Sequence, residues 1–216
     1  SGYAAVWARE NTREAIFDAM KRKEVYATTG PRMTVRTFGG FDFSQDDAYS
    51  NNFARIGYEK GVPMGGDLPV APNGKKFSMM IAASKDPDGA NLDRVQVIKG
   101  WVDSAGKQHE RIYDAAVSGD RKVGKDGRCK TPVGSTVDLE TATYKNTIGE
   151  AVLTSTWIDP NFDPTVASFY YVRVIEIPTP RWTAFDTVRY GVEMPKEVTM
   201  VLQERAYTSP IWYTPK

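Results

Sequence analysis

Apolar residues near the start of the chain recur at helical spacing, and the pattern then changes to alternation. Four of them lie on one face of a predicted helix, with Phe17 beside them: Ala15, Ile16, Ala19 and Met20. Asn11 is placed to cap this helix, and Glu14, three residues later, completes a capping-box pattern. Residues 25–29 are rich in strand formers, and a Gly-Pro turn precedes an alternating run at 33–38. The sequence therefore predicts a helix followed by the first of many strands.

Beyond residue 38 the pattern predicts strands joined by turns. Residues 38–72 are interrupted by glycine, proline, asparagine and aspartate, so we expect a long irregular loop there. Five strand-like runs follow: 77–83, 95–102, 109–117, 151–158 and 169–177. The second and third of these runs flank a Ser-Ala-Gly-Lys turn and predict a hairpin. The last is apolar on both faces, which is typical of a central strand.

The C-terminal part completes a mainly β pattern. A short helix is predicted at 183–191 and a last strand at 198–203. An apolar run at 3–8 predicts a further strand before the N-terminal helix. Strands at this spacing, separated by turn signals, indicate an antiparallel β-sandwich-like domain that follows an N-terminal strand-helix-strand unit.

Composition narrows the classes of function. The chain has 216 residues, of which 41% are hydrophobic, so it can bury a core. Its net charge of +1 provides no electrostatic field that would attract nucleic acid or an anionic membrane. No apolar run is long enough to span a bilayer, so we expect neither a nucleic-acid partner nor membrane insertion. The single cysteine, Cys129, excludes an internal disulfide and any multi-cysteine metal site.

Titratable residues suggest several sites, and a simpler interpretation competes with each. The only histidine, His109, lies in the predicted hairpin; one imidazole does not make a catalytic zinc site, so we interpret it as a surface or packing residue. Cys129 stands between two basic residues that would lower the pKa of its thiol, but it lacks a plausible base and is expected to be an incidental exposed thiol.

Two acidic clusters invite the hypothesis of a calcium site: Asp86, Asp88 and Asp93, and Asp42, Asp46 and Asp47. In the first, Gly89 comes too early for an EF-hand loop and the twelfth position lacks glutamate, so turn and cap roles explain it better. The second is interpreted as a solvated loop.

Several separate blocks carry a family resemblance: AAVWARENTREAIFDAMKRKEVYATTGPRM near the N-terminus, KDPDGANLDRVQVIKGWVD at 85–103, STWIDPNFDP at 155–164, FYYVRVIEIPTPRWT at 169–183 and ERAYTSPIWYTP at 204–215. Together they resemble the C-terminal portion of the DUF3604 family, bacterial proteins of unknown function. Members of that family look like relatives of the PHP (polymerase and histidinol phosphatase) metal-dependent phosphoesterases.

The resemblance implies a division of the chain and of the chemistry. Residues 1–37 would be the last βα unit of a PHP-like barrel, and 38–216 a β-sandwich-like C-terminal domain. The family's divalent metal, zinc or manganese, would be held upstream, because a chain with one histidine cannot rebuild that centre; no cofactor is expected in this portion. The chain opens without an initiator methionine, so we expect an upstream region. The resemblance to the family implies that the protein is periplasmic or exported.

Two clusters are candidates for ligand binding. Tyr26, Thr28, Thr29 and Arg32 would lie at the end of the barrel-derived unit, where active-site loops gather. Arg181, Trp182 and Trp212 place guanidinium and indole groups in loops near the C-terminus, where they could stack on a sugar ring or hold an anion. Alternatively, these groups pack the β body against the barrel.

Two functional hypotheses follow. In one, the chain is a non-catalytic part of a hydrolase that docks on the barrel and walls its cleft; its partners are the missing barrel of the same protein or, through exposed apolar surface, a second copy. In the other, it is a binding module for carbohydrate or another small molecule that uses Trp182, Trp212 and nearby tyrosines. A groove lined by exposed aromatics favours binding, whereas buried aromatics and an exposed apolar face around Tyr3, Val6 and Trp7 favour docking.

Overall fold

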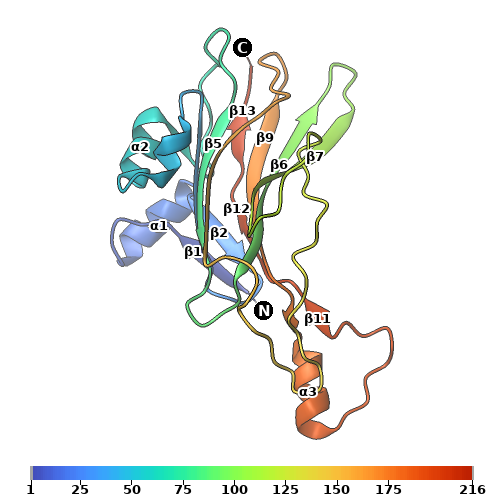
Figure 1. The fold of residues 1–216 in the computed structure, drawn as a ribbon. Coiled ribbons are helices and arrows are strands. Elements are labelled where there is room, and N and C mark those ends of the chain that lie inside the picture. The colour runs from blue at the N-terminus through green and yellow to red at the C-terminus, as the bar shows by residue number, and fades with distance from the viewer. Residues whose placement is uncertain (1, 216) are drawn as a thin grey trace.

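Two antiparallel sheets face each other in a computed structural model that describes residues 2–215 (Figure 1). The first sheet has the order β1 (Tyr3–Val6), β2 (Val25–Thr28), β12 (Arg205–Thr208), β9 (Ser168–Glu176), β6 (Leu92–Val102) and β7 (Gln108–Val117), with β13 (Ile211–Tyr213) also paired to β9. The second has the order β4 (Gly61–Pro63), β3 (Thr34–Gly40), β5 (Ser78–Ser84) and β8 (Val152–Ile158). The predicted mainly β, sandwich-like fold is confirmed.

The core lies between the two sheets, and strict alternation builds it. Along β9 every second residue is buried, while the residues between them are half-buried on the outer face. Valines of β6 and β9 meet Met79 and Ile81 of β5 in one apolar cluster. Because β9 pairs on both edges, its predicted central position is confirmed.

A helical layer covers the outer face of the second sheet, where the sequence analysis expected only irregular loop. The segment contains a short 3-10 helix, η1 (Gln45–Tyr49), and α2 (Phe53–Lys60) before β4. Gly57 allows this helix to lie close to β3, because a Cβ there would lie 2.3 Å from the Phe38 ring. Phe38, Phe43 and Met80 form a second buried cluster under these helices.

The N-terminal helix, α1 (Arg13–Lys21), lies beside the pair β1 and β2 (Figure 1). Its cap is Thr12 and not Asn11, as the side chain of Thr12 accepts a hydrogen bond of 3.3 Å from the Ala15 amide. β1 and β2 are antiparallel neighbours in the first sheet, whereas consecutive strands of a β/α barrel are parallel. The descent of residues 1–37 from a barrel thus stays a prediction of the resemblance.

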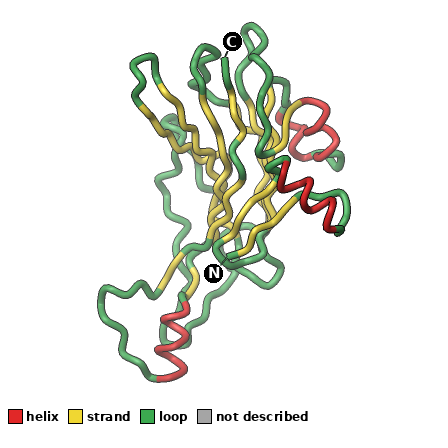
Figure 2. The backbone as a smooth tube through the Cα atoms, turned by 180° about the vertical axis from the view of Figure 1, so that it is seen from behind, coloured by secondary structure: helices red, strands yellow, loops and turns green. Residues whose placement is uncertain are grey.

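A small extension leaves one end of the sandwich (Figures 1 and 2). It consists of the two-stranded pair β10 (Thr179–Pro180) and β11 (Val201–Leu202) with helix α3 (Trp182–Tyr190) between them. The helix is confirmed to within one residue at each end. The predicted last strand is shorter than expected, and the chain continues from it into β12 and β13.

Glu176, the last residue of β9, gives the fold a dependence on pH. Its side chain is 1% exposed, its Oε1 has no hydrogen-bond partner among the described residues, and burial together with Glu204 and Asp86 raises its pKa from 4.5 to about 8. The folded state therefore keeps a proton that the unfolded state releases above about pH 4.5.

We expect this contribution to the free energy of unfolding to be complete below about pH 4.5 and lost as the pH rises through about 8. Its upper bound is about 5 kcal/mol, at about 1.36 kcal/mol per pKa unit. Glu176→Gln, which cannot ionise, should flatten this slope in urea unfolding measured from pH 5 to 9. An unchanged slope would show that Glu176 is ionised in the folded protein.

Candidate functional site

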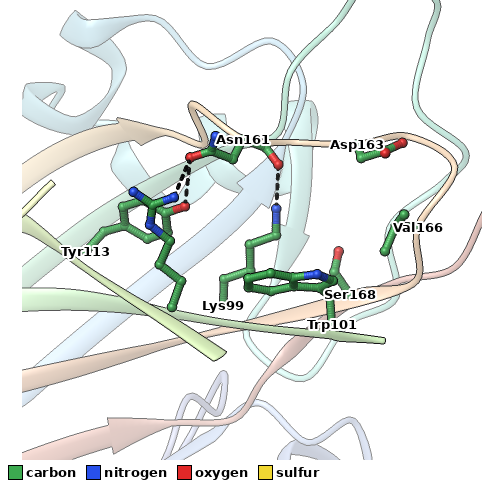
Figure 3. Close-up of a pocket in the computed structure, with 8 residues that line it drawn as sticks. Lys99, Trp101, Tyr113, Asn161, Asp163, Val166 and Ser168 are labelled. Carbon is green, nitrogen blue, oxygen red and sulfur yellow. Dashed lines mark hydrogen bonds between the residues drawn. The ribbon is translucent and has the colours of Figure 1, made fainter. Parts of the chain in front are cut away.

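Two hollows adjoin at the end of the sandwich where β13 and the β6–β7 hairpin lie, the upper end in Figure 1. They share Trp101 and Ser168. The inner pocket, of about 280 Å³, faces the loop between β8 and β9 (Figure 3). The outer groove, of about 640 Å³, lies among the ends of β6, β7, β9 and β13. Several of its lining residues are aromatic or small: Gly100, Trp101, Phe169, Trp212 and Tyr213.

A buried ion pair forms the floor of the inner pocket. Lys99 Nζ lies 2.7 Å from Asp159 Oδ2 and donates to the Asn161 carbonyl at 2.8 Å. The same carboxylate accepts from the Tyr170 hydroxyl at 2.8 Å and from the Asn161 amide at 2.8 Å. Burial, with the Asp159 charge beside it, raises the pKa of Tyr170 far above its usual range. The charge of Lys99 is therefore balanced inside the protein and holds the β8–β9 loop.

The rim of the inner pocket is polar. The Asn161 side-chain oxygen accepts from Arg111 and from the Tyr113 hydroxyl, both at 3.2 Å (Figure 3). The Arg111 guanidinium also lies 5.1 Å from the centre of the Tyr113 ring. This network fixes the position of Asn161 at the mouth of the pocket.

His109 stands where the two strands of the hairpin face each other. Its ring stacks on Trp101, with centroids 5.1 Å apart and an interplanar angle of 15°, and its Nε2 lies 2.7 Å from Asp103 Oδ2. This hydrogen bond lowers the pKa of Asp103. His109 does pack, as the sequence analysis expected, but it also lines the outer groove.

A third hollow lies on the other side of the molecule, beside α1, and we call it the α1 cleft. It has a volume of about 860 Å³ and is lined by the loop after β1, by α1, and by residues of β3 and α2. Glu24, 1% exposed, accepts a hydrogen bond from Tyr58 and lies 3.4 Å from Arg22 and 3.8 Å from Arg36. The Arg36 guanidinium stands over the Trp7 ring at 4.4 Å, so it is held between an indole and a carboxylate.

A family model described as "Protein of unknown function (DUF3604)" matches residues 1–215. The chain belongs to the DUF3604 family. No curated protein and no solved structure matches it. Because the match covers nearly the whole chain, the sandwich, the outer groove and the α1 cleft all lie within the DUF3604 region.

The residues predicted near the C-terminus of this DUF3604 chain lie at two opposite ends. Trp212 is 42% exposed on β13, with its ring 5.1 Å from Phe169 in the outer groove. Arg181 and Trp182 begin α3 at the far end, where Trp182 is 60% exposed. They do not form one site with Trp212. The sequence missed the groove because its residues come from four strand ends, and only the pairing of β9 with β6 and β13 brings them together.

The other predicted cluster is also divided, because its side chains are buried or bonded elsewhere in the protein. Tyr26 packs against the core, and Thr28 is buried, with no hydrogen-bond partner for its hydroxyl among the described residues. The Thr29 hydroxyl bonds with Glu204 and accepts from the Arg205 amide. Arg32 donates from its backbone to Asp86 at 2.6 Å, which lowers the pKa of that carboxyl group.

The acidic turn that follows acts as a set of caps. Asp86 also accepts the Asp88 amide at 3.1 Å, and Asp93 pairs with Arg94 and Arg121. The turn and cap interpretation agrees with the bonds of Asp86, whereas Asp93 is a buried residue of β6 that is held by two arginines. Within residues 2–215, no group of three His, Cys, Asp or Glu side chains is arranged to hold a metal ion.

The prediction of a solvated acidic loop is wrong in part, and the prediction that the Cys129 thiol is exposed is wrong. Asp42 is exposed and pairs with Lys75, but Asp47 is nearly buried and pairs with Lys60 at 2.7 Å. Cys129 is buried, since Asp114 accepts its backbone amide and draws the surrounding loop onto the first sheet. Over the same described residues, no helix combines the length and apolarity needed to cross a membrane.

The contribution of the buried Lys99–Asp159 ion pair to the free energy of unfolding can be measured with variants. Lys99→Met should lower the free energy of unfolding by about 3 kcal/mol, because it leaves the Asp159 carboxylate buried without its cation. The double variant Lys99→Met with Asp159→Asn should recover part of the lost unfolding free energy, because it no longer has the unpaired carboxylate. The control Lys107→Met, at an exposed turn position, should change stability by less than about 0.5 kcal/mol in the same urea titration. Equal effects of the two lysine variants would contradict the assigned role of Lys99.

Proposed function

We propose that this chain is the non-catalytic C-terminal portion of a PHP-like metal-dependent hydrolase of unknown substrate. In the whole protein it docks on the catalytic barrel and forms one wall of the cleft. The metal, zinc or manganese, is held by upstream residues. The observation that carries the proposal is the unpartnered apolar surface of β1 and α1.

β1 supports the proposal because it ends the first sheet. It pairs with β2 along one edge and has no strand on its other edge among residues 2–215. Natural proteins cover or charge such an edge, since its free amides and carbonyls recruit further strands. Tyr3 on this strand is 58% exposed, which adds an apolar group to the open edge.

α1 supports it because the helix has apolar residues on more than its inner face. Ala19 is buried against the sandwich, whereas Phe17 is 63% exposed and Met20 54%. Phe17 and Met20 are three residues apart, so they are neighbours on the helix surface. A helix that is apolar on two sides is typical of one covered on both sides.

The α1 cleft suits the wall of a polar substrate site. It is lined in part by the loop after β1 and by α1, the elements that carry the proposed docking surface. Its charged side chains have both signs: Arg9, Arg22 and Arg36 with Glu10, Glu14, Asp18 and Glu24. Arg9 comes directly from that loop and is available for a ligand that also contacts the barrel.

Activity measurements separate this proposal from an enzyme contained within the chain. Phosphoesterase turnover with added Mn²⁺ or Zn²⁺ should require the full-length protein and should be absent from the 216-residue chain. The two proteins are compared at equal concentration with a small phosphoester substrate. Turnover by the 216-residue chain alone would contradict the non-catalytic assignment.

Docking through α1 can be tested by placing one charged side chain on the exposed apolar face of this helix. Phe17→Asp should change the unfolding free energy of the 216-residue chain by less than about 0.5 kcal/mol, because the side chain is exposed there. In the full-length protein the same change should reduce thermal stability and activity, because it buries an unpaired carboxylate at the interface.

The matched control is Phe185→Asp on α3, an equally large and half-exposed phenylalanine at the opposite end. Phe185→Asp should leave the stability of both proteins and the activity of the full-length protein nearly unchanged. A Phe17→Asp variant that behaves like the control in the full-length protein would rule out this face as the docking surface. If Phe17→Asp instead converts a dimer of the 216-residue chain into monomers, this face of α1 joins two copies of the chain.

A further inference from the structure

The outer face of the first sheet carries a row of aromatic side chains that the docking proposal does not use. Phe169 and Tyr171 lie on this face of β9, and their rings stack with centroids 6.5 Å apart. Trp212 lies beside Phe169, since these two residues are paired in the register of β13 with β9. The helices α1 and α2 lie on the side of the second sheet, so they do not cover this row (Figures 1 and 2).

A glycine shapes the floor of the outer groove. A Cβ at Gly100 would lie 2.3 Å from the Phe169 ring, so the ring rests directly on the backbone of β6. The Trp212 ring is inclined to it by 45° at a centroid distance of 5.1 Å. Both rings line the groove, and its volume of about 640 Å³ is within the range of small-molecule sites.

The rim supplies hydrogen-bonding groups without a cation. Gln108 and Glu110 of β7 and Thr214 after β13 line the groove, together with Ser168. Neither lysine nor arginine is among its described lining residues, so the groove has no partner for a phosphate or carboxylate. His109 also borders the groove, but its ring stacks on Trp101 and its Nε2 is bonded to Asp103, so it lies on the other face of the hairpin from Glu110.

We infer that the outer groove binds a neutral saccharide. The C–H face of a sugar ring stacks on Trp212 and Phe169, and its hydroxyl groups bond to Gln108, Glu110 and the other rim groups. The aromatic surface requires an apolar face on the ligand, and the amide, hydroxyl and carboxylate groups of the rim require several hydroxyl groups; a sugar ring combines both. A quaternary ammonium ion suits the site less well, because two rings in an open angle do not enclose a cation.

The test uses the 216-residue chain, so its outcome is separate from the docking proposal. Binding of glucose, galactose, mannose, xylose, N-acetylglucosamine, cellobiose and maltose is measured by ligand-observed NMR and calorimetry at millimolar concentrations. Inorganic phosphate and tetramethylammonium serve as probes for anion and cation binding. At least one saccharide should bind saturably, and Trp212→Ala should weaken it by about tenfold or more.

Two further variants make the test specific. Trp182→Ala removes another exposed tryptophan, at the far end of the sandwich, and should leave binding unchanged. Glu110→Ala, an exposed rim position, should weaken binding several-fold and remains informative if Trp212→Ala does not fold. The inference is overturned if none of the saccharides binds, if Trp182→Ala weakens binding as much as Trp212→Ala, or if only phosphate or tetramethylammonium binds in a Trp212-dependent way.

Discussion

Strand β9 is paired along both edges, and the alternation of its side chains places the hydrophobic core on one side and a half-buried aromatic surface on the other. β6 occupies one edge over nearly the full length. The other edge is shared by β12 and β13, and at the break between them the Thr208 hydroxyl accepts the Val172 amide at 2.9 Å. The first sheet therefore depends on one strand, and both hollows at the open end are built around its first residues.

The inner row of β9 is apolar in the middle and polar at its ends, and the two ends are stabilised differently. At one end Tyr170 joins Asp159 and Lys99 in a network in which each buried polar group has a partner. At the other end Glu176 is buried beside two carboxylates and is expected to be neutral near pH 7. Well-paired charge thus fixes the loop that borders the candidate binding site, while an unpaired acid makes the opposite end sensitive to pH.

The two surfaces that we assign to function lie at different places on the sandwich and have different chemistry. One is the β1 edge of the first sheet with α1, and the other lies at the ends of β6, β7, β9 and β13 in the same sheet. The β1 and α1 surface combines exposed apolar groups with charges of both signs, as expected of a part that meets a larger polar body. The outer groove is aromatic and uncharged except at its rim. A single chain can therefore contact a catalytic domain on one side and hold a ligand on the other without competition between them.

Sequence alone was enough to predict the long strands, the β6–β7 hairpin, the central place of β9, α3 and the family, because alternation, turn residues and motif blocks are local properties of the chain. The short strands β4, β12 and β13 were not predicted. The helix α2 was not predicted, because turn-forming residues flank it on both sides and the close contact of Gly57 with Phe38 exists only after folding.

Nor did the sequence join Trp212 to Trp101, Phe169 and His109, or separate it from Trp182. Those residues are far apart along the chain, and their neighbours are decided by the register of β13 and β6 on β9. The burial of Cys129 also depends on a contact formed only after folding, since Asp114 on β7 accepts the amide of Cys129 from a loop. Local pattern decided the elements, and the pairing of distant strands decided the sites, because side chains from different strands meet only where the sheet aligns them.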